Sequence, residues 1–262
     1  MSVISSQLED VQASADKRNI AIDKVGIKDI RHPIKVLQRD GEIQHSVANV
    51  SMYVELPHHQ KGTHMSRFIE ILNETQSAYT TESFAEMLNV MTQRLEANQA
   101  YVEMTFPFFV NKKAPASGSA GLIDYEMSLL GEINNGKATV KTRVVVAATS
   151  LCPCSKKISD YGAHNQRSHI TITAQSDQAL QVEQLIDIAE KQASAEVFSI
   201  LKRSDEKVVT EQAYDNPKFV EDLIRDVASS LDAVKSISAY TVEAENFESI
   251  HNHSAYAMVS KG

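Results

Sequence analysis

The stretch G-L-I-D-Y-E-M-S-L-L-G-E-I-N-N-G-K-A-T-V-K-T-R-V-V-V-A-A-T (residues 121–149) contains two segments with strand character on either side of Asn135-Gly136. An Asn-Gly pair between two such segments is a strong signal for a two-residue β-hairpin turn, because both turn residues must adopt positive φ. The segments 121–130 and 137–149 are therefore predicted to form an antiparallel pair of strands in the middle of the chain.

A similar order of elements is predicted before and after this hairpin. The segment 46–56 alternates apolar and polar residues like a half-buried strand, and 84–95 has its apolar residues spaced as on one face of a helix. Further strands are predicted at 101–106, 167–174, 236–243 and 254–260, and further helices at 66–72, through 182–200 and, after the pair Asn216-Pro217, through 219–231. This order predicts an α+β fold of antiparallel sheets with paired helices packed on one face.

The duplication is one of architecture, since no sequence repeat relates the two halves. We expect a flexible N-terminal arm over residues 1–20, a first module over 21–135 and a second module over 136–262. Polar residues without periodic apolar neighbours predict flexible loops at 152–166 and 203–216.

Charge and hydropathy exclude several classes of protein. A net charge of −8 argues against a protein that binds nucleic acid or a membrane surface, which normally carries a basic field. No apolar run approaches the roughly 20 residues of a membrane span, and the N-terminal segment has no apolar core of a secretory signal. We therefore expect a protein of the reducing cytoplasm, where disulfides are rare.

The two cysteines of the chain, Cys152 and Cys154, lie one proline apart in T-S-L-C-P-C-S-K (149–156). A disulfide, a chance pairing and a reactive site are the three possible explanations. Side chains two residues apart on a strand are about 6.5–7 Å apart, whereas a disulfide needs Cβ atoms about 3.8 Å apart. This geometry disfavours the disulfide.

Three further polar clusters fall outside the periodic elements, at 161–167, 204–207 and 248–253. Together with the cysteines they supply thiolate, imidazole and carboxylate, which is the ligand set of a catalytic divalent metal rather than of a structural zinc finger. Spacing does not decide which cysteine would be the ligand. Taken singly, a cysteine at a strand end is more often a small buried hydrophobe, and Glu206 or Glu221 more often lies on a solvated face.

A different signal lies in the first half. The stretch K-G-T-H-M-S-R (61–67) combines a glycine with basic and hydroxyl residues just before a predicted helix. Such a loop can hold an anionic group at the helix N-terminus, although many loops of this kind only begin a helix.

Four separated stretches resemble the prokaryotic GTP cyclohydrolase IB family, and they occur in the order typical of it: 61–68, 150–156, 161–168 and 248–257. The resemblance extends from about residue 18 to the C-terminus. It implies a tunnelling fold, with two such modules per chain, assembled into a homotetramer. It also implies conversion of GTP and water to formate and 7,8-dihydroneopterin triphosphate, the first step towards tetrahydrofolate, with manganese, zinc or iron as the metal and metal-activated water attacking purine C8.

The same resemblance assigns roles to residues. It implies Cys152, His164 and His251 as metal ligands, with Glu206 as a further ligand in some states. Cys154, Glu248 and His253, together with Cys152, form the implied catalytic set and handle protons. Glu221 is expected to anchor the guanine edge, because a carboxylate can accept both N1–H and the exocyclic amine. The triphosphate is expected to meet charge-assisted donors from His64, Ser66, Arg67, Lys156 and Arg167.

Two other functions stay open at this point. A non-catalytic protein of the same fold would bind a pterin or purine through a carboxylate such as Glu221 and leave the thiolate and imidazoles idle. A thiol-redox protein would instead use Cys152 and Cys154 as a reversible pair.

Overall fold

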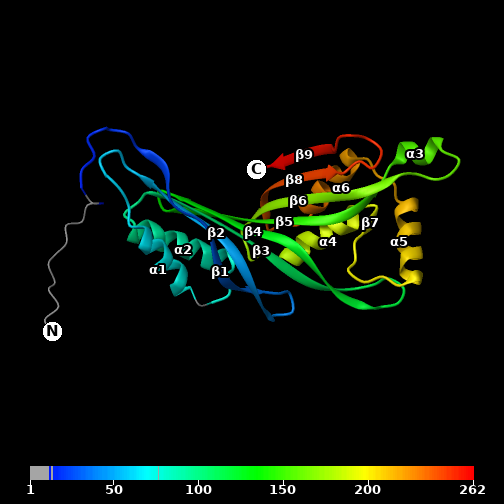
Figure 1. The fold of residues 1–262 in the computed structure, drawn as a ribbon, viewed down its shortest axis with the longest axis horizontal. Coiled ribbons are helices and arrows are strands. Elements are labelled where there is room, and N and C mark those ends of the chain that lie inside the picture. The colour runs from blue at the N-terminus through cyan, green and yellow to red at the C-terminus, as the bar shows by residue number, and fades with distance from the viewer. Residues whose placement is uncertain (1–11, 13, 76) are drawn as a thin grey trace.

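The computed structural model describes residues 12, 14–75 and 77–262, and it shows an elongated molecule built on a single antiparallel sheet (Figure 1). The strand order along the sheet is β1-β2-β3-β4-β5-β6-β8-β9, with the short β7 paired to β5. The strands are β1 (Ile22–Leu37), β2 (Ile43–Leu56), β3 (Gln99–Lys113), β4 (Ala120–Asn134), β5 (Lys137–Leu151), β6 (Asn165–Ser176), β7 (Ala195–Glu196), β8 (Ile237–Asn246) and β9 (Ala255–Lys261).

The central hairpin is confirmed. Asn134 at the end of β4 pairs with Lys137 at the start of β5. The two turn residues have positive φ, 47° at Asn135 and 80° at Gly136, as a tight hairpin with right-handed strand twist requires. The β4–β5 ladder joins the two halves of the chain into one continuous sheet.

The helices pack on one face of this sheet, which confirms the predicted α+β class. They are α1 (Met65–Glu74), α2 (Thr81–Arg94), α3 (Pro153–Ile158), α4 (Val182–Gln192), α5 (Arg203–Asp215) and α6 (Val220–Asp232). Helix α2 covers β3, β4 and β5, α4 covers β5 and β6, and α6 covers β8 and β9. At Gly131 an added Cβ would lie 2.8 Å from the Phe84 ring, so a glycine is needed where α2 approaches β4 most closely.

One predicted helix is too long. The apolar spacing through 182–200 predicted a single long helix, but α4 ends at Gln192. Ala195 pairs instead with Thr149 of β5, and the hydroxyl of Ser194 accepts a hydrogen bond from the backbone N–H of Leu151 at 3.1 Å. The strand end that precedes the cysteines therefore recruits this segment, because the backbone groups at the end of β5 need partners.

The prediction of a flexible loop at 203–216 is wrong, because most of this segment forms α5. Only Asp205 and Ala213 of this helix are buried, so it lacks the apolar periodicity that reveals a helix in sequence. Asn216 ends α5, and α6 begins only at Val220 after Phe219. The pair Asn216-Pro217 therefore separates two helices and does not start the second one.

Asp205 fixes the start of α5 to the loop between β3 and β4. Its fully buried carboxylate accepts hydrogen bonds from the N–H groups of Ala116 at 2.8 Å and Ser117 at 2.7 Å, and from the Ser117 hydroxyl at 2.7 Å. It also accepts the N–H of Lys202 at 2.8 Å, at the helix start. One carboxylate thus connects the first half of the chain to the second.

Replacing Asp205 by asparagine is expected to lower the melting temperature at neutral pH. Burial alone would raise the pKa of Asp205, but hydrogen bonds from Ser117, Lys202 and Ala116 outweigh it and hold the pKa below its usual range. A depressed folded-state pKa contributes stability above the unfolded pKa, and this stability is lost as pH falls through the folded value. Thermal unfolding is expected to show that the difference in melting temperature between wild type and Asp205→Asn becomes smaller below about pH 4.

The control for this substitution is Asp215→Asn at the exposed end of the same helix, which is expected to leave the melting temperature unchanged. A gap that stays the same at every pH would contradict the role assigned to Asp205.

The domain boundaries stay a prediction. Most of the predicted arm lies outside the described residues, although Ser14 and Asp16 form backbone hydrogen bonds with Lys61 and His59. Within the described part of the chain, no helix is both long and apolar enough to cross a membrane.

Candidate functional site

Cys152 lies where β5 ends and α3 begins. It is the N-cap residue of α3, and its sulfur accepts a hydrogen bond from the backbone N–H of Ser155 at 3.5 Å. Pro153 is favourable directly after it, because the first turn of a helix needs no N–H from that position. Both cysteines are free thiols, with Cys152 half-buried and Cys154 exposed. The predicted loop at 152–166 is thus interrupted by a short helix that gives the two cysteines different surroundings.

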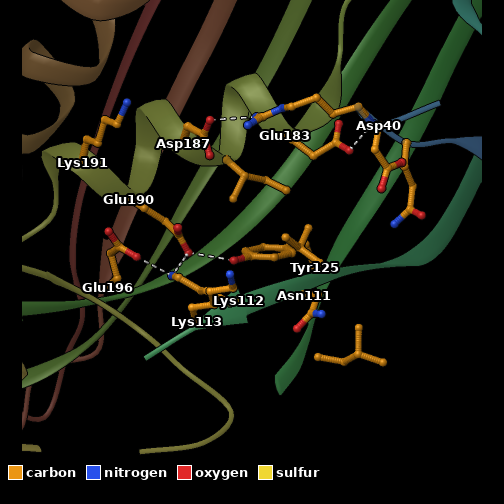
Figure 2. Close-up of a pocket in the computed structure, with 15 residues that line it drawn as sticks. Asp40, Asn111, Lys112, Lys113, Tyr125, Glu183, Asp187, Glu190, Lys191 and Glu196 are labelled. Atoms are coloured by element: carbon orange, nitrogen blue, oxygen red, sulfur yellow. Dashed lines mark hydrogen bonds and ion pairs between the residues drawn. The ribbon is translucent and has the colours of Figure 1, made fainter. Parts of the chain in front are cut away.

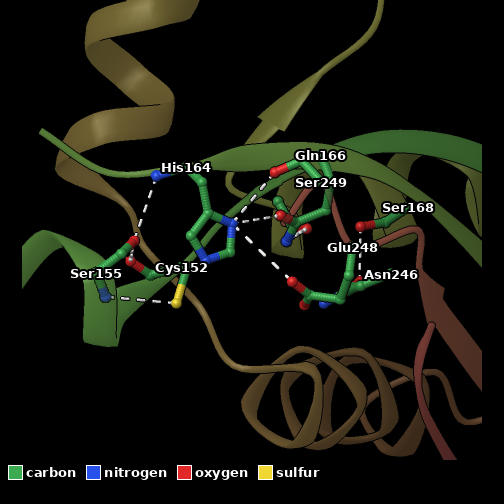
Figure 3. Close-up of polar contacts among 9 residues, drawn as sticks. Cys152, Ser155, His164, Gln166, Ser168, Asn246, Glu248 and Ser249 are labelled. Carbon is green, nitrogen blue, oxygen red and sulfur yellow. Dashed lines mark hydrogen bonds and ion pairs between the residues drawn. The ribbon is translucent and has the colours of Figure 1, made fainter. Parts of the chain in front are cut away.

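His164 is brought beside Cys152 by backbone pairing. The N–H of Cys152 donates to the carbonyl of His164 at 3.1 Å, and the N–H of His164 donates to the Ser155 hydroxyl at 3.3 Å. Figure 3 shows the Cys152 thiol on the side of the imidazole that faces away from Gln166. Two of the predicted ligands therefore meet at the end of the β5–β6 hairpin.

Three oxygen atoms surround Nδ1 of His164 (Figure 3). The Oε1 atom of Gln166 lies at 3.0 Å, the Oγ atom of Ser249 at 3.4 Å and the Oε2 atom of Glu248 at 4.0 Å. The side chains of His164 and Glu248 are only 14% and 13% exposed. Among the described residues, Oε2 of Glu248 is a buried side-chain oxygen without a hydrogen-bond partner.

These groups fit a divalent metal in their chemistry. A thiolate and an imidazole nitrogen are ligands for zinc and iron, and carboxylate oxygens also suit manganese. A carboxylate oxygen without a hydrogen-bond partner can serve as a further ligand or as a base. A buried carboxylate also needs a cation or a proton beside it, because an unpaired buried charge is costly. Cys152, His164 and Glu248 are therefore candidate members of a metal site.

The remaining predicted ligands are not assembled with them. His251 is exposed in the loop between β8 and β9, where its ring stacks at 5.2 Å on that of His253, the residue predicted to handle protons. Glu206 is exposed on α5, next to the buried Asp205. Across residues 12, 14–75 and 77–262, no group of three or more His, Cys, Asp or Glu side chains is close enough to hold a metal ion. The four-residue ligand set stays a prediction.

Glu221 lies in the first turn of α6, and its side chain is exposed. The segment before this helix is held to the end of β5, because the N–H of Lys218 donates to the carbonyl of Leu151 at 3.2 Å. A carboxylate at a helix N-terminus is also favoured by the helix dipole. The candidate guanine anchor is therefore held at the same end of the sheet as Cys152.

The five predicted triphosphate contacts are dispersed. Lys156 donates to the carbonyl of Tyr214 and lies over its ring at 4.2 Å, so it already has a partner within the chain. Arg167 is exposed and, by strand alternation, points to the opposite face of β6 from Gln166. His64 precedes α1, whereas Ser66 and Arg67 lie within it, and Figure 1 shows α1 and α3 near opposite ends of the molecule.

Gln166 and Ser249 lie within the predicted polar clusters at 161–167 and 248–253, but the sequence assigned no role to them or to Ser150. The signal for Gln166 was its position two residues after His164, which directly precedes β6, because side chains two apart in extended chain face the same way. Ser150 is directly opposite Gln166 in the β5–β6 register.

A second group of buried charges lies away from these residues, around a cavity of about 770 Å³ (Figure 2). Lys112 of β3 forms ion pairs of 2.7 Å with Glu190 of α4 and with Glu196 of β7. The hydroxyl of Tyr125 donates to Glu190 at 2.7 Å. Burial raises the pKa of Glu190, which the hydrogen bond from Lys112 opposes. This cluster joins the first half of the chain to the second.

Comparison with known proteins supplies the family. A family model described as type I GTP cyclohydrolase folE2 matches residues 8–257. GTP cyclohydrolase FolE2 of Methylobacillus flagellatus is 61% identical over 254 residues, covering 97% of this chain and 96% of the relative. GTP cyclohydrolase FolE2 of Nitrosococcus oceani is 58% identical over 258 residues, covering 98% and 97%.

Solved structures with the same arrangement of elements are distant in sequence. Uricase from Arthrobacter globiformis superposes with a TM-score of 0.58 at 8% identity, covering 91% of this chain and 92% of the uricase. A uricase from Bacillus fastidious gives 0.54 at 12% identity, covering 94% of each chain. This likeness concerns the fold alone, which is the predicted tunnelling fold. By the family model and by relatives near 60% identity over nearly its whole length, the chain belongs to the type I GTP cyclohydrolase FolE2 family.

Proposed function

We propose that this protein is a GTP cyclohydrolase that converts GTP and water to formate and 7,8-dihydroneopterin triphosphate, the first step of tetrahydrofolate biosynthesis. The observation that carries the proposal is the match to FolE2 relatives over nearly the full length of both chains. The meeting of Cys152, His164 and Glu248 at one end of the sheet supports it, because the reaction needs groups that activate water and move protons.

The metal in this proposal is a divalent ion, with manganese, zinc and iron as candidates. Cys152 and His164 would hold it, with His251 and Glu206 as further ligands. When bound, the metal ion would act as a Lewis acid that makes water nucleophilic near neutral pH, as attack at purine C8 requires.

The protein groups then divide the remaining work. The buried Oε2 of Glu248 has no hydrogen-bond partner among the described residues, so it is available to take a proton from water and return it to a departing nitrogen. Cys154 and His253 are exposed, and they are proposed to move protons between the site and solvent. Glu221 orients the base, and basic residues bind the triphosphate, including Lys156 and Arg167.

Glu221→Gln is expected to raise KM for GTP by about 10- to 150-fold, because a hydrogen bond to a charged group contributes about 1.5–3 kcal/mol. Asp222→Asn is the matched control, since Asp222 is an exposed carboxylate in the same first helical turn. Steady-state kinetics with GTP measure the effect. An unchanged KM in Glu221→Gln would remove Glu221 from the guanine site.

The function itself is tested in two steps. The protein is first loaded with manganese, zinc or iron in the absence of oxygen, and it is then incubated with GTP. Formate and a fluorescent oxidised pterin are the expected products. Binding of GTP without either product, with every metal, would instead favour a purine- or pterin-binding protein of the same fold. Thiol titration before and after peroxide would identify a reversible Cys152–Cys154 pair and hence a redox protein.

We further propose the type IB designation, a cytoplasmic location and a homotetrameric assembly. The assembly is supported by the distance between α1 and α3 within one chain, because the proposed triphosphate contacts at both places would need a second copy to meet (Figure 1). Light scattering on the purified protein measures the number of copies.

A further inference from the structure

The side chain of Gln166 is fixed on one side by Ser150. The two residues are directly opposite each other on β6 and β5, and they are 9% and 3% exposed. The amide Nε2 of Gln166 donates to the hydroxyl of Ser150 at 2.8 Å. With the amide nitrogen on the Ser150 side, the amide oxygen of the same group lies on the other side.

That oxygen meets His164. Oε1 of Gln166 lies 3.0 Å from Nδ1 of the imidazole. An amide oxygen only accepts hydrogen bonds, so the contact is favourable only when Nδ1 carries the proton. In the neutral ring the lone pair then resides on Nε2, the nitrogen that a metal or a substrate proton would use.

The other neighbours of Nδ1 allow the same arrangement but are placed less closely. Oγ of Ser249 lies at 3.4 Å and Oε2 of Glu248 at 4.0 Å, and both residues come from the loop after β8. Gln166 lies within the strand ladder, with a second hydrogen bond that restricts its rotation. It is therefore the most rigid acceptor of the three.

We infer that Gln166 is a positioning residue for His164. Its amide nitrogen is held by Ser150, and its Oε1 accepts a hydrogen bond from His164 Nδ1–H. This contact keeps the imidazole in the Nδ1–H tautomer and directs the imidazole Nε2 towards the Cys152 side of the site. The inference rests on the proposed function only in taking His164 as a ligand. Partners of this kind orient metal-binding histidines and typically account for about 10- to 100-fold in metal affinity.

The first test uses metal-free protein and does not depend on activity. Nitrogen-15 NMR of the imidazole rings, assigned with a His164→Gln variant, is expected to show the Nδ1–H tautomer in the wild type. Gln166→Leu, which removes the acceptor at similar volume, is expected to shift His164 towards a mixture of tautomers. Gln166→Glu, which keeps an acceptor, is expected to retain Nδ1–H.

The second test measures affinity for zinc and manganese by competition with a chelating dye. Gln166→Leu is expected to bind about 10- to 100-fold more weakly, and Gln166→Glu is expected to restore most of the affinity. Ser168→Ala is the matched control, because Ser168 is buried on the same face of β6 and bonds Asn246 rather than His164. It is expected to change stability without changing tautomer or affinity.

Two results would overturn the inference. One is a wild-type His164 protonated on Nε2, and the other is an unchanged tautomer and affinity in Gln166→Leu. If the leucine variant does not fold, the wild-type tautomer still decides, because His164 protonated on Nε2 would overturn the inference. A protein that shows the expected tautomers but forms no pterin from GTP would leave the role of Gln166 intact and remove the proposed function instead.

Discussion

Cys152→Ala is expected to lower kcat/KM for GTP by more than about 100-fold, because even the outer partners of metal ligands account for about 10- to 100-fold. The loss should come with reduced metal content. The fold should be retained, because the sulfur forms one long hydrogen bond, at 3.5 Å to the N–H of Ser155. Metal analysis, a pterin fluorescence assay and thermal unfolding on the same preparation measure the three quantities.

Lys157→Ala is the control for this substitution, because Lys157 is exposed on the same short helix and has no assigned role. It is expected to keep activity and metal. Comparison with Cys154→Ala then separates the two cysteines, since the exposed thiol is expected to affect turnover more than metal content. Full metal occupancy in Cys152→Ala would exclude this thiol as a ligand.

Lys112→Met is expected to destabilise the protein by about 3–5 kcal/mol, the usual cost of removing one partner of a buried ion pair. The Lys112 side chain is 12% exposed and Glu190 is 7% exposed, and both Glu190 and Glu196 would be left without their cation. Denaturant unfolding measures the change. Arg39→Met is the matched control, because Arg39 also connects the two halves, to Asp187, but at a surface where both side chains are nearly half exposed. It should cost less than about 1 kcal/mol.

The loss in Lys112→Met should also depend on pH. Burial already raises the pKa of Glu190, and removing Lys112 takes away the hydrogen bond that opposes the rise. A carboxyl group whose folded pKa lies above its unfolded value costs stability when ionised, and this cost disappears as pH falls through the folded value. The difference in unfolding free energy between wild type and Lys112→Met should therefore be large at neutral pH and small in acid. A difference that grows in acid would contradict this account.

Much of the fold could be predicted from local patterns. The Asn135-Gly136 turn and the alternation in β5 depend on neighbouring residues, and both predictions are confirmed. The end of α4 and the existence of α5 could not be predicted in this way. The segment after Gln192 is recruited by the end of β5, and α5 is held by Asp205 through a loop distant in sequence. Both depend on tertiary contacts that leave little apolar periodicity.

The candidate site divides along the same line. Cys152, His164 and Glu248 were named from motifs and lie together, because strand pairing and the loop after β8 bring them to one end of the sheet. No role was predicted for Gln166, because its two-residue spacing from His164 indicates a shared face and not a function. The proposed contacts on α1 lie near the far end of the molecule, which no property of the sequence indicated (Figure 1).

The contact between Asp205 and the loop at Ala116 and Ser117 limits how the protein can be recombined. A chimera that joins the first half of one relative to the second half of another would separate the carboxylate from the loop with which it evolved. Such a hybrid would keep α5 in place only if the incoming loop offered two N–H groups and a hydroxyl at the same spot. Compatibility between parental proteins would thus depend on a few backbone atoms, largely independent of overall identity.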